Sequence, residues 1–187
     1  MKQKWSVTKI VFMGVLAAVV CVITLYRFPL LGSKVHLANG ICLLSGLLMG
    51  PFAGGLAAGL GSAVYDVLLG GYGMVEAVIT FINKFAMAWV CGKIAFAADS
   101  EAKNPRWNIA ASVIGALTYV ALYLGKTFIF QKFVYGYPAD AVWATVLSKM
   151  PASLINALAA MVSAPILYAA LRAALDRSGL LKKMRGE

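Results

Sequence analysis

The sequence has little charge, and acidic residues are especially scarce. Only 13% of its 187 residues are charged, with 7 Asp and Glu against 17 Lys and Arg, and there is one histidine. Soluble domains usually contain about 25% charged residues. By contrast, 61% of the residues are hydrophobic and the mean hydropathy is +0.82. This composition excludes an ordinary soluble domain and predicts an integral membrane protein.

Catalytic and metal-binding motifs are also missing. The three cysteines, Cys21, Cys42 and Cys91, lie inside apolar runs, where cysteine is typically a small buried side chain. There is no HExxH, GxSxG or paired CxxC motif. Gly125-Lys126-Thr127 resembles the end of a P-loop, but Val120 occupies the place of the first glycine. We therefore expect no enzyme activity, cofactor or metal, and no ATP-driven transport by this chain alone.

Long apolar runs separated by polar connections predict an all-α membrane protein with six transmembrane helices in one bundle. The first run lacks a small-x-small cleavage site and is interpreted as a retained span. Pro151 and Pro165 are expected to bend the last helix. We expect one domain over residues 1–187. The predicted spans are 7–30, 36–49, 52–69, 74–97, 108–130 and 144–175.

The distribution of lysine and arginine predicts that both termini are cytoplasmic. In this orientation most basic residues lie inside, and a smaller group lies outside. The outer group is Arg27, Lys34, Lys126, Lys132 and Lys149. The net charge of +10 therefore indicates topology and contact with anionic lipid, not nucleic-acid binding. The predicted location is the plasma membrane, crossed several times.

Residues 36–71 contain an apolar stretch that Gly50-Pro51 divides into two helices joined by a tight turn. Small residues recur every four positions in this hairpin, at Gly46, Gly50 and Gly54 and at Gly55 and Gly59. Such spacing lets helix backbones approach closely in lipid. Two interpretations remain open: these residues pack the chain's own helices together, or they form a surface for a partner protein.

Polar residues within the spans are expected to gather near the outer surface. With a rise of about 1.5 Å per residue, Asp66 and Glu76 lie at similar depths and Lys84 lies deeper. Polar and aromatic residues also recur at helical spacing in the last three spans. Ionisable groups in a bilayer normally face a bundle interior or an aqueous cavity, so we predict an outward-opening pocket. The candidate binding residues are His36, Asn39, Asp66, Glu76, Thr80, Asn83, Lys84, Tyr123, Lys126, Trp143, Lys149 and Asn156.

Several of these residues also have structural interpretations. Lys126 and Lys149 can extend to the outer interface, and Trp143, with Tyr135 and Tyr137, can form an interfacial aromatic belt. Asp66 or Glu76 can cap a helix or form a structural ion pair with Lys126. His36 can cap the following helix.

Residues 36–71, HLANGICLLSGLLMGPFAGGLAAGLGSAVYDVLLGG, are followed at 79–95 by ITFINKFAMAWVCGKIA. Together they resemble the substrate-binding (S) components of energy-coupling factor (ECF) vitamin transporters, most closely the riboflavin-type S-component family. The resemblance implies a transmembrane T component and two cytosolic ATPases as partners. It also implies an outward-facing substrate site formed mainly by the last three spans and the outer loops.

The resemblance assigns docking of the T component to the first three spans. Family members often have an AxxxA pair in span one, and here the nearest equivalent is Gly14 and Ala18. The candidate docking residues are Gly14, Ala18, Gly46, Gly50, Gly54, Gly55 and Gly59.

The polar candidates suit a small polar heterocycle, because carboxylates, amides and lysines supply hydrogen bonds and aromatic side chains can stack on a flat ring. The family name indicates riboflavin, and a pyrimidine or pyridoxine-like vitamin precursor remains an alternative. A different function is also open: a self-sufficient proton-coupled carrier in which Asp66, Glu76 and Lys84 titrate during transport.

Overall fold

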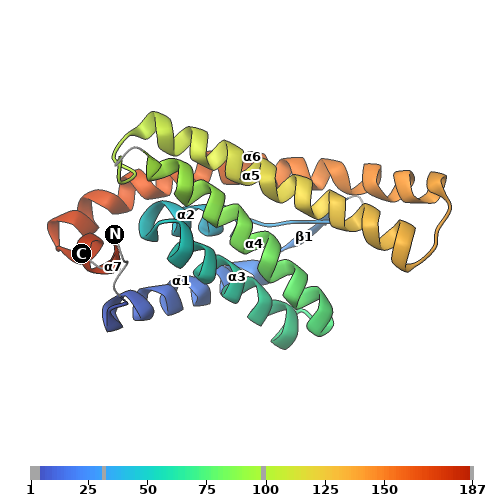
Figure 1. Ribbon diagram of the computed structural model, residues 1–187, viewed down its shortest axis with the longest axis horizontal. Helices are drawn as coiled ribbons and strands as arrows, with labels where there is room; N and C mark the ends of the chain where they lie inside the picture. Colours follow the sequence, from blue (N-terminus) through green and yellow to red (C-terminus); the bar gives the residue numbers. More distant parts are fainter. Residues whose placement is uncertain (1–4, 31–32, 98–99, 186–187) are drawn as a thin grey trace.

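The computed structural model describes residues 5–30, 33–97 and 100–185, which form a helical bundle with one small β-hairpin (Figure 1). The described residues contain seven α-helices, whereas the sequence predicted six. The six-span topology and the side of the membrane on which the termini lie stay predictions. The elements are α1 (Val7–Leu25), β1 (Phe28–Leu30), β2 (Ser33–Val35), α2 (Ala38–Met49), α3 (Pro51–Leu68), α4 (Gly73–Ala95), α5 (Pro105–Ile129), the π-helical segment η2 (Phe130–Val134), α6 (Ala139–Arg177) and α7 (Leu180–Arg185).

Helix α1 ends earlier than predicted, and a β-hairpin takes the place of its last residues. Ser6 caps the helix by accepting a hydrogen bond from the backbone N–H of Lys9 at 3.2 Å. The helix stops at Leu25, and Phe28 pairs with Val35 in an antiparallel ladder. Pro29 cannot donate a helical hydrogen bond, so the predicted span 7–30 was too long at its end.

Helix α2 forms the centre of the bundle. Every residue from Ala38 to Met49 is buried. It turns directly into α3 at Gly50, whose φ of 79° is a backbone conformation that glycine adopts without strain. Pro51 then occupies the first turn of α3, where its missing N–H costs nothing. The tight turn predicted at Gly50-Pro51 is therefore present, although α2 begins at Ala38 rather than His36.

The small residues of this hairpin pack against the chain's own helices. A Cβ atom on Gly46 would collide with the backbone of Ala88 in α4, and one on Gly54 would lie 2.6 Å from Gly46. Gly55 and Gly59 face phenylalanine rings of α4 in the same way. These glycines and Gly50 are buried within the chain, and their role in docking a partner stays a prediction. The alternative interpretation, packing within the chain, explains them.

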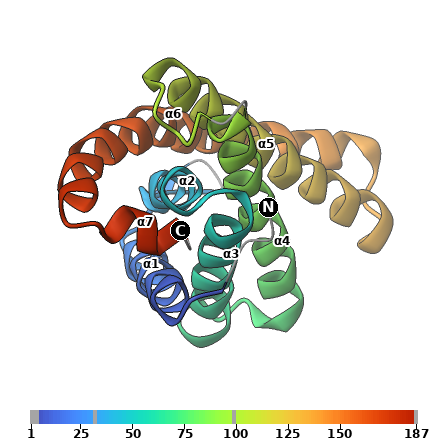
Figure 2. The same cartoon turned by 60° about the vertical axis from the view of Figure 1, so that its left-hand side comes forward.

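Helices α5 and α6 extend beyond the other helices at one end of the bundle (Figure 1). Helix α5 continues into the π-helical segment η2. Helix α6 has 39 residues, starts before the predicted boundary at 144, and contains both Pro151 and Pro165. It curves around the bundle, as expected for a helix with interior prolines (Figure 2).

The basic C-terminal segment folds into α7 against the opposite end of the bundle. Leu181 and Met184 bury their side chains there because they share one face of the short helix. Arg185 donates a hydrogen bond from Nε to the carbonyl of Leu48 and another from Nη2 to the hydroxyl of Tyr168, both at 3.3 Å. Helix α1 begins and α7 ends on the same side of the bundle (Figure 1).

Four of the described helical segments are long and apolar enough to cross a membrane. They are Val7–Leu25, Gly73–Ala95, Pro105–Val134 and Ala139–Arg177, and Ala38–Met49 is a shorter apolar helix. Many large apolar side chains on their outer faces are exposed, as expected for helices that contact lipid.

Candidate functional site

A polar cavity of about 410 Å³ lies between the β-hairpin, α1 and α3 to α6. This volume lies within the range of roughly 300 to 1,000 Å³ that is typical of small-molecule sites. The lining residues are Thr24, Arg27, Ser33, Lys34, His36, Ser62, Asp66, Tyr72, Glu76, Thr80, Lys84, Tyr119, Tyr123, Lys126, Lys149, Ser153 and Asn156.

Asn156 of α6 holds the end of the β-hairpin against the cavity. Its Oδ1 accepts a hydrogen bond from the backbone N–H of His36 at 2.8 Å, and its Nδ2 donates one to the carbonyl of Lys34 at 2.7 Å. The hydroxyl groups of Ser33 and Tyr123 are also 3.1 Å apart. The hairpin is thus attached to both α5 and α6 by polar contacts over the cavity.

Two tyrosines of α5 form an aromatic wall. The rings of Tyr119 and Tyr123 are stacked one turn apart, with centroids separated by 6.0 Å. The ammonium group of Lys84 lies 4.0 Å from the centre of the Tyr119 ring, and that of Lys149 lies 5.8 Å from the Tyr123 ring. Both distances allow a cation–π interaction. Lys84 also donates a hydrogen bond to Oδ1 of Asn39.

The two carboxylates of the cavity are in different surroundings. Glu76 forms an ion pair with Lys126, whose Nζ lies 2.7 Å from both Oε1 and Oε2. Asp66 is buried and has no Lys, Arg or His nitrogen within 4.0 Å in the described part of the chain. Lys126 thus offsets the charge of Glu76, whereas no ion pair among the described residues offsets that of Asp66.

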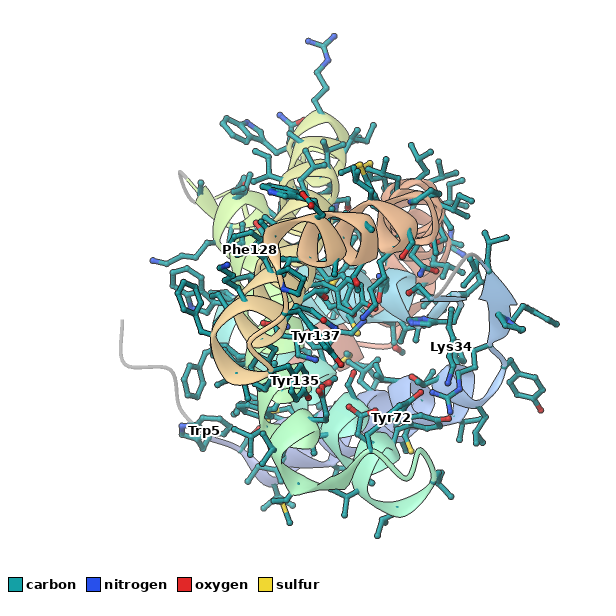
Figure 3. All side chains as sticks on the ribbon, turned by 90° about the vertical axis from the view of Figure 1, so that its right-hand side faces the viewer. Trp5, Lys34, Tyr72, Phe128, Tyr135 and Tyr137 are labelled. Carbon is teal, nitrogen blue, oxygen red and sulfur yellow. The ribbon has the colours of Figure 1, made fainter. Side chains whose placement is uncertain are left out.

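Arg27 and Lys34 bring further positive charge to the side of the cavity formed by α1 and the hairpin. Both donate a hydrogen bond to the hydroxyl of Tyr72, from Arg27 at 2.8 Å. The Arg27 guanidinium also lies 4.9 Å from the centre of the Tyr65 ring. Figure 3 shows Lys34 and Tyr72 near each other on this side of the molecule. Because this hydroxyl is neutral, neither contact offsets the positive charge of its donor.

Nine of the twelve predicted site residues line this cavity, and they come from the hairpin end and from α3 to α6. These residues are His36, Asp66, Glu76, Thr80, Lys84, Tyr123, Lys126, Lys149 and Asn156.

The other three predicted site residues do not line the cavity. Asn39 and Asn83 are buried, and Asn39 reaches the cavity indirectly as the partner of Lys84. Trp143 is 55% exposed and packs on Phe128, with ring centroids 5.4 Å apart. Tyr135 and Tyr137, predicted as interfacial aromatics, are exposed on the end of the molecule that faces the viewer in Figure 3. They too are absent from the cavity lining.

Sequence reasoning left eight lining residues out of the candidate list. Arg27, Ser33, Lys34 and Tyr72 lie in connections between helices, where no helical spacing marks them. Thr24 and Ser62 lie singly in apolar helices. Tyr119 and Ser153 share the helical spacing of Tyr123 and Asn156, so this spacing identifies them although they were left out of the candidate list.

Of the predicted docking residues, Gly14 and Ala18 alone lie on an exposed face among the described residues. A Cβ atom on Gly14 would have no heavy atom within 4 Å. This face of α1 is open to lipid or to another protein.

Comparison with known proteins identifies the family. The family model for the ECF-type riboflavin transporter S component matches residues 4–173. This chain belongs to that family. The resemblance inferred from residues 36–95 is confirmed over most of the sequence.

A solved structure supports the fold of this S component. The chain described as "Structure and mechanism of the S component of a bacterial ECF transporter" superimposes with a TM-score of 0.68 and 18% identity, covering 90% of this chain and 98% of that one. No curated protein matches the chain. Family and fold together confirm the predictions of a transport protein and of a helical protein that crosses the membrane several times.

Proposed function

We propose that the chain is the substrate-binding subunit of an ECF importer in the plasma membrane. It captures a small water-soluble vitamin, or a heterocyclic precursor of a cofactor, from outside and delivers it together with a T component and two ATPases. Riboflavin is the substrate that the family name suggests. The single observation that carries this proposal is the polar cavity enclosed by lipid-compatible helices.

Energetic considerations favour ligand binding in this cavity. Charged side chains within a membrane protein are costly unless they are paired or contact water or a ligand. Lys84 is 3% exposed and Asp66 is 8% exposed, yet neither has an oppositely charged partner within 4.0 Å among the described residues. A structural role needs no such groups, whereas a polar ligand gains hydrogen bonds from them.

The need for partner proteins is inferred from the lack of a nucleotide-binding motif in the sequence. The sequence contains no P-loop, so release driven by ATP requires another chain. We propose that the exposed face of α1 with Gly14 and Ala18 contacts the T component, because small residues there permit close approach of another helix. We also propose that both termini are cytoplasmic and that the cavity opens outward.

The proton-coupled carrier is less well supported. Its relay would use Asp66, Glu76 and Lys84, but the Glu76 carboxylate already has a bidentate partner in Lys126. The family assignment also supports a binding subunit rather than an independent carrier.

The test separates binding from transport. Purified protein, without ATP or partners, should bind radiolabelled riboflavin or a competing vitamin at one site per chain. The same protein alone in proteoliposomes should not concentrate that compound, with or without a proton gradient. Concentrative uptake that a protonophore abolishes would instead establish the carrier.

A further inference from the structure

We propose that the ligand of this cavity is a planar ring compound carrying an acidic group, a carboxylate or a phosphate. This inference rests on the proposed binding function and narrows its substrate class. Riboflavin has no such group, so the proposal differs from the substrate in the family name.

The charges that line the cavity are strongly unequal. Five cationic side chains, Arg27, Lys34, Lys84, Lys126 and Lys149, face two carboxylates, Asp66 and Glu76. They come from the first connection and from three different helices, so the imbalance is not the solvated face of one helix. An acidic ligand would offset this excess, because opposite charges attract strongly where water is partly excluded.

Among the residues that the structure describes, four of the five cations have no carboxylate partner. Within the described ranges, Lys126 is the lining cation that has a carboxylate oxygen within 4.0 Å. Arg27 and Lys34 donate to the hydroxyl of Tyr72, and Lys84 donates to the amide oxygen of Asn39. Lys149 lies over the ring of Tyr123. Neutral partners orient these cations without cancelling their charge.

Burial increases the cost of leaving this charge uncompensated. Lys84 is 3% exposed, and a buried ammonium group without a counter-ion loses much of its hydration energy. Nδ1 of His36 is also buried without a hydrogen-bond partner in the part of the chain that the structure describes, and His36 lines the same cavity. Among the described residues, the cavity lining therefore contains both uncompensated charge and a polar atom without a hydrogen bond.

The two tyrosines of the aromatic wall indicate that the ligand also contains a flat ring. Tyr119 and Tyr123 line the cavity beside Lys84 and Lys149, respectively. Flat rings pack well against such side chains, and the adjacent ammonium groups can bind an acidic substituent of the ring. The combination favours an acidic aromatic compound over a simple inorganic anion.

The experiment uses pairs of probes that share a ring and differ in charge. Orotate is compared with uracil, nicotinate with nicotinamide, and FMN with riboflavin, by calorimetry with the purified full-length chain. For the ring that fits, the acidic member should bind at least about tenfold more tightly, because hydrogen bonds to a charged group are stronger than those between neutral groups. Small molecules extracted from the purified protein are identified by mass spectrometry in parallel.

Two lysine variants test whether the preference for acidic probes arises in this cavity. Lys149→Gln should reduce the acidic-to-neutral affinity ratio severalfold. Lys132→Gln removes the same charge from an exposed position in η2 that does not line the cavity, and it should leave the ratio unchanged. Equal reduction in both variants would attribute the preference to net charge and overturn the assignment to this cavity.

The remaining outcomes separate this inference from the proposed function. If the neutral member binds as tightly as the acidic one, the inference fails while the binding function stands. If no probe binds, an extracted ligand with an acidic group supports the inference and one without it overturns the inference. If no probe binds and no ligand is extracted, the proposed function fails, and this inference fails with it.

Discussion

The ammonium group of Lys126 lies 2.7 Å from each carboxylate oxygen of Glu76 and joins α5 to α4 beside the cavity. Glu76→Gln should therefore raise the affinity for an acidic ligand, because Lys126 loses its counter-charge. Lys126→Met should lower it, and the double variant, which has the net charge of the wild type, should lie between them. Calorimetry with the acidic probe that binds best measures this order. The opposite order would show that Glu76 itself contacts the ligand.

The two hydrogen bonds of Asn156 should restrict the motion of the β-hairpin end and slow the dissociation of the ligand. Asn156→Ala should free the segment around Lys34 and His36 and leave the His36 N–H without its partner, at a cost of roughly 1 to 3 kcal/mol. We expect faster amide hydrogen exchange at residues 33–37 and a higher rate of ligand dissociation. Thr145→Val, on the same helix, removes a hydroxyl that bonds to its own helix at Ala141 and should change neither quantity.

Glycines at two kinds of site should respond differently to the same change. Gly46→Val should destabilise the fold by about 1 to 3 kcal/mol or more, because the new side chain meets the backbone of α4 at Ala88. A Cβ atom at Gly14 has no heavy atom within 4 Å, so Gly14→Val should leave thermal stability in detergent nearly unchanged while co-purification with the T component falls. A large loss of stability at Gly14, or none at Gly46, would contradict the packing described above.

Helix α7 should contribute to stability through Arg185. Arg185→Ala removes the hydrogen bonds to the Leu48 carbonyl and the Tyr168 hydroxyl and should lower Tm by several degrees. Lys182→Ala changes an exposed residue of the same helix and should have little effect. Differential scanning fluorimetry of both variants provides the test, and equal Tm values would mean that α7 does not hold the bundle end.

The sequence predicted the helical bundle well because apolar runs of bilayer length have few other interpretations. The predictions were wrong where packing between helices, rather than spacing along one helix, decides which side chain faces the cavity. Glu76, Thr80 and Asn83 recur at helical spacing. Glu76 and Thr80 line the cavity as this spacing predicts, but the next lining residue is Lys84, and Asn83 is buried away from the cavity. Positions i+7 and i+8 differ by about 100° around a helix, so neighbour packing decides which one faces the interior.

Other parts of the site could not be predicted from helical spacing. Arg27 and Lys34 belong to a connection whose β-hairpin folds back over the cavity, and Tyr72 follows α3 in a turn. The glycine pattern of residues 46–59 was equally consistent with two uses, because close approach of helices has the same sequence signature within one chain and between chains. Contacts with Ala88 and the rings of α4 show that packing within the chain is one of these uses.

The most direct test of the account is the binding stoichiometry of the purified chain, without nucleotide or partners, measured by native mass spectrometry. We predict one small molecule per chain in the wild type, and a large loss of occupancy when Lys84 and Lys149 are both replaced by glutamine. No bound molecule in the wild type, or unchanged occupancy in the double variant, would contradict a ligand held in this cavity.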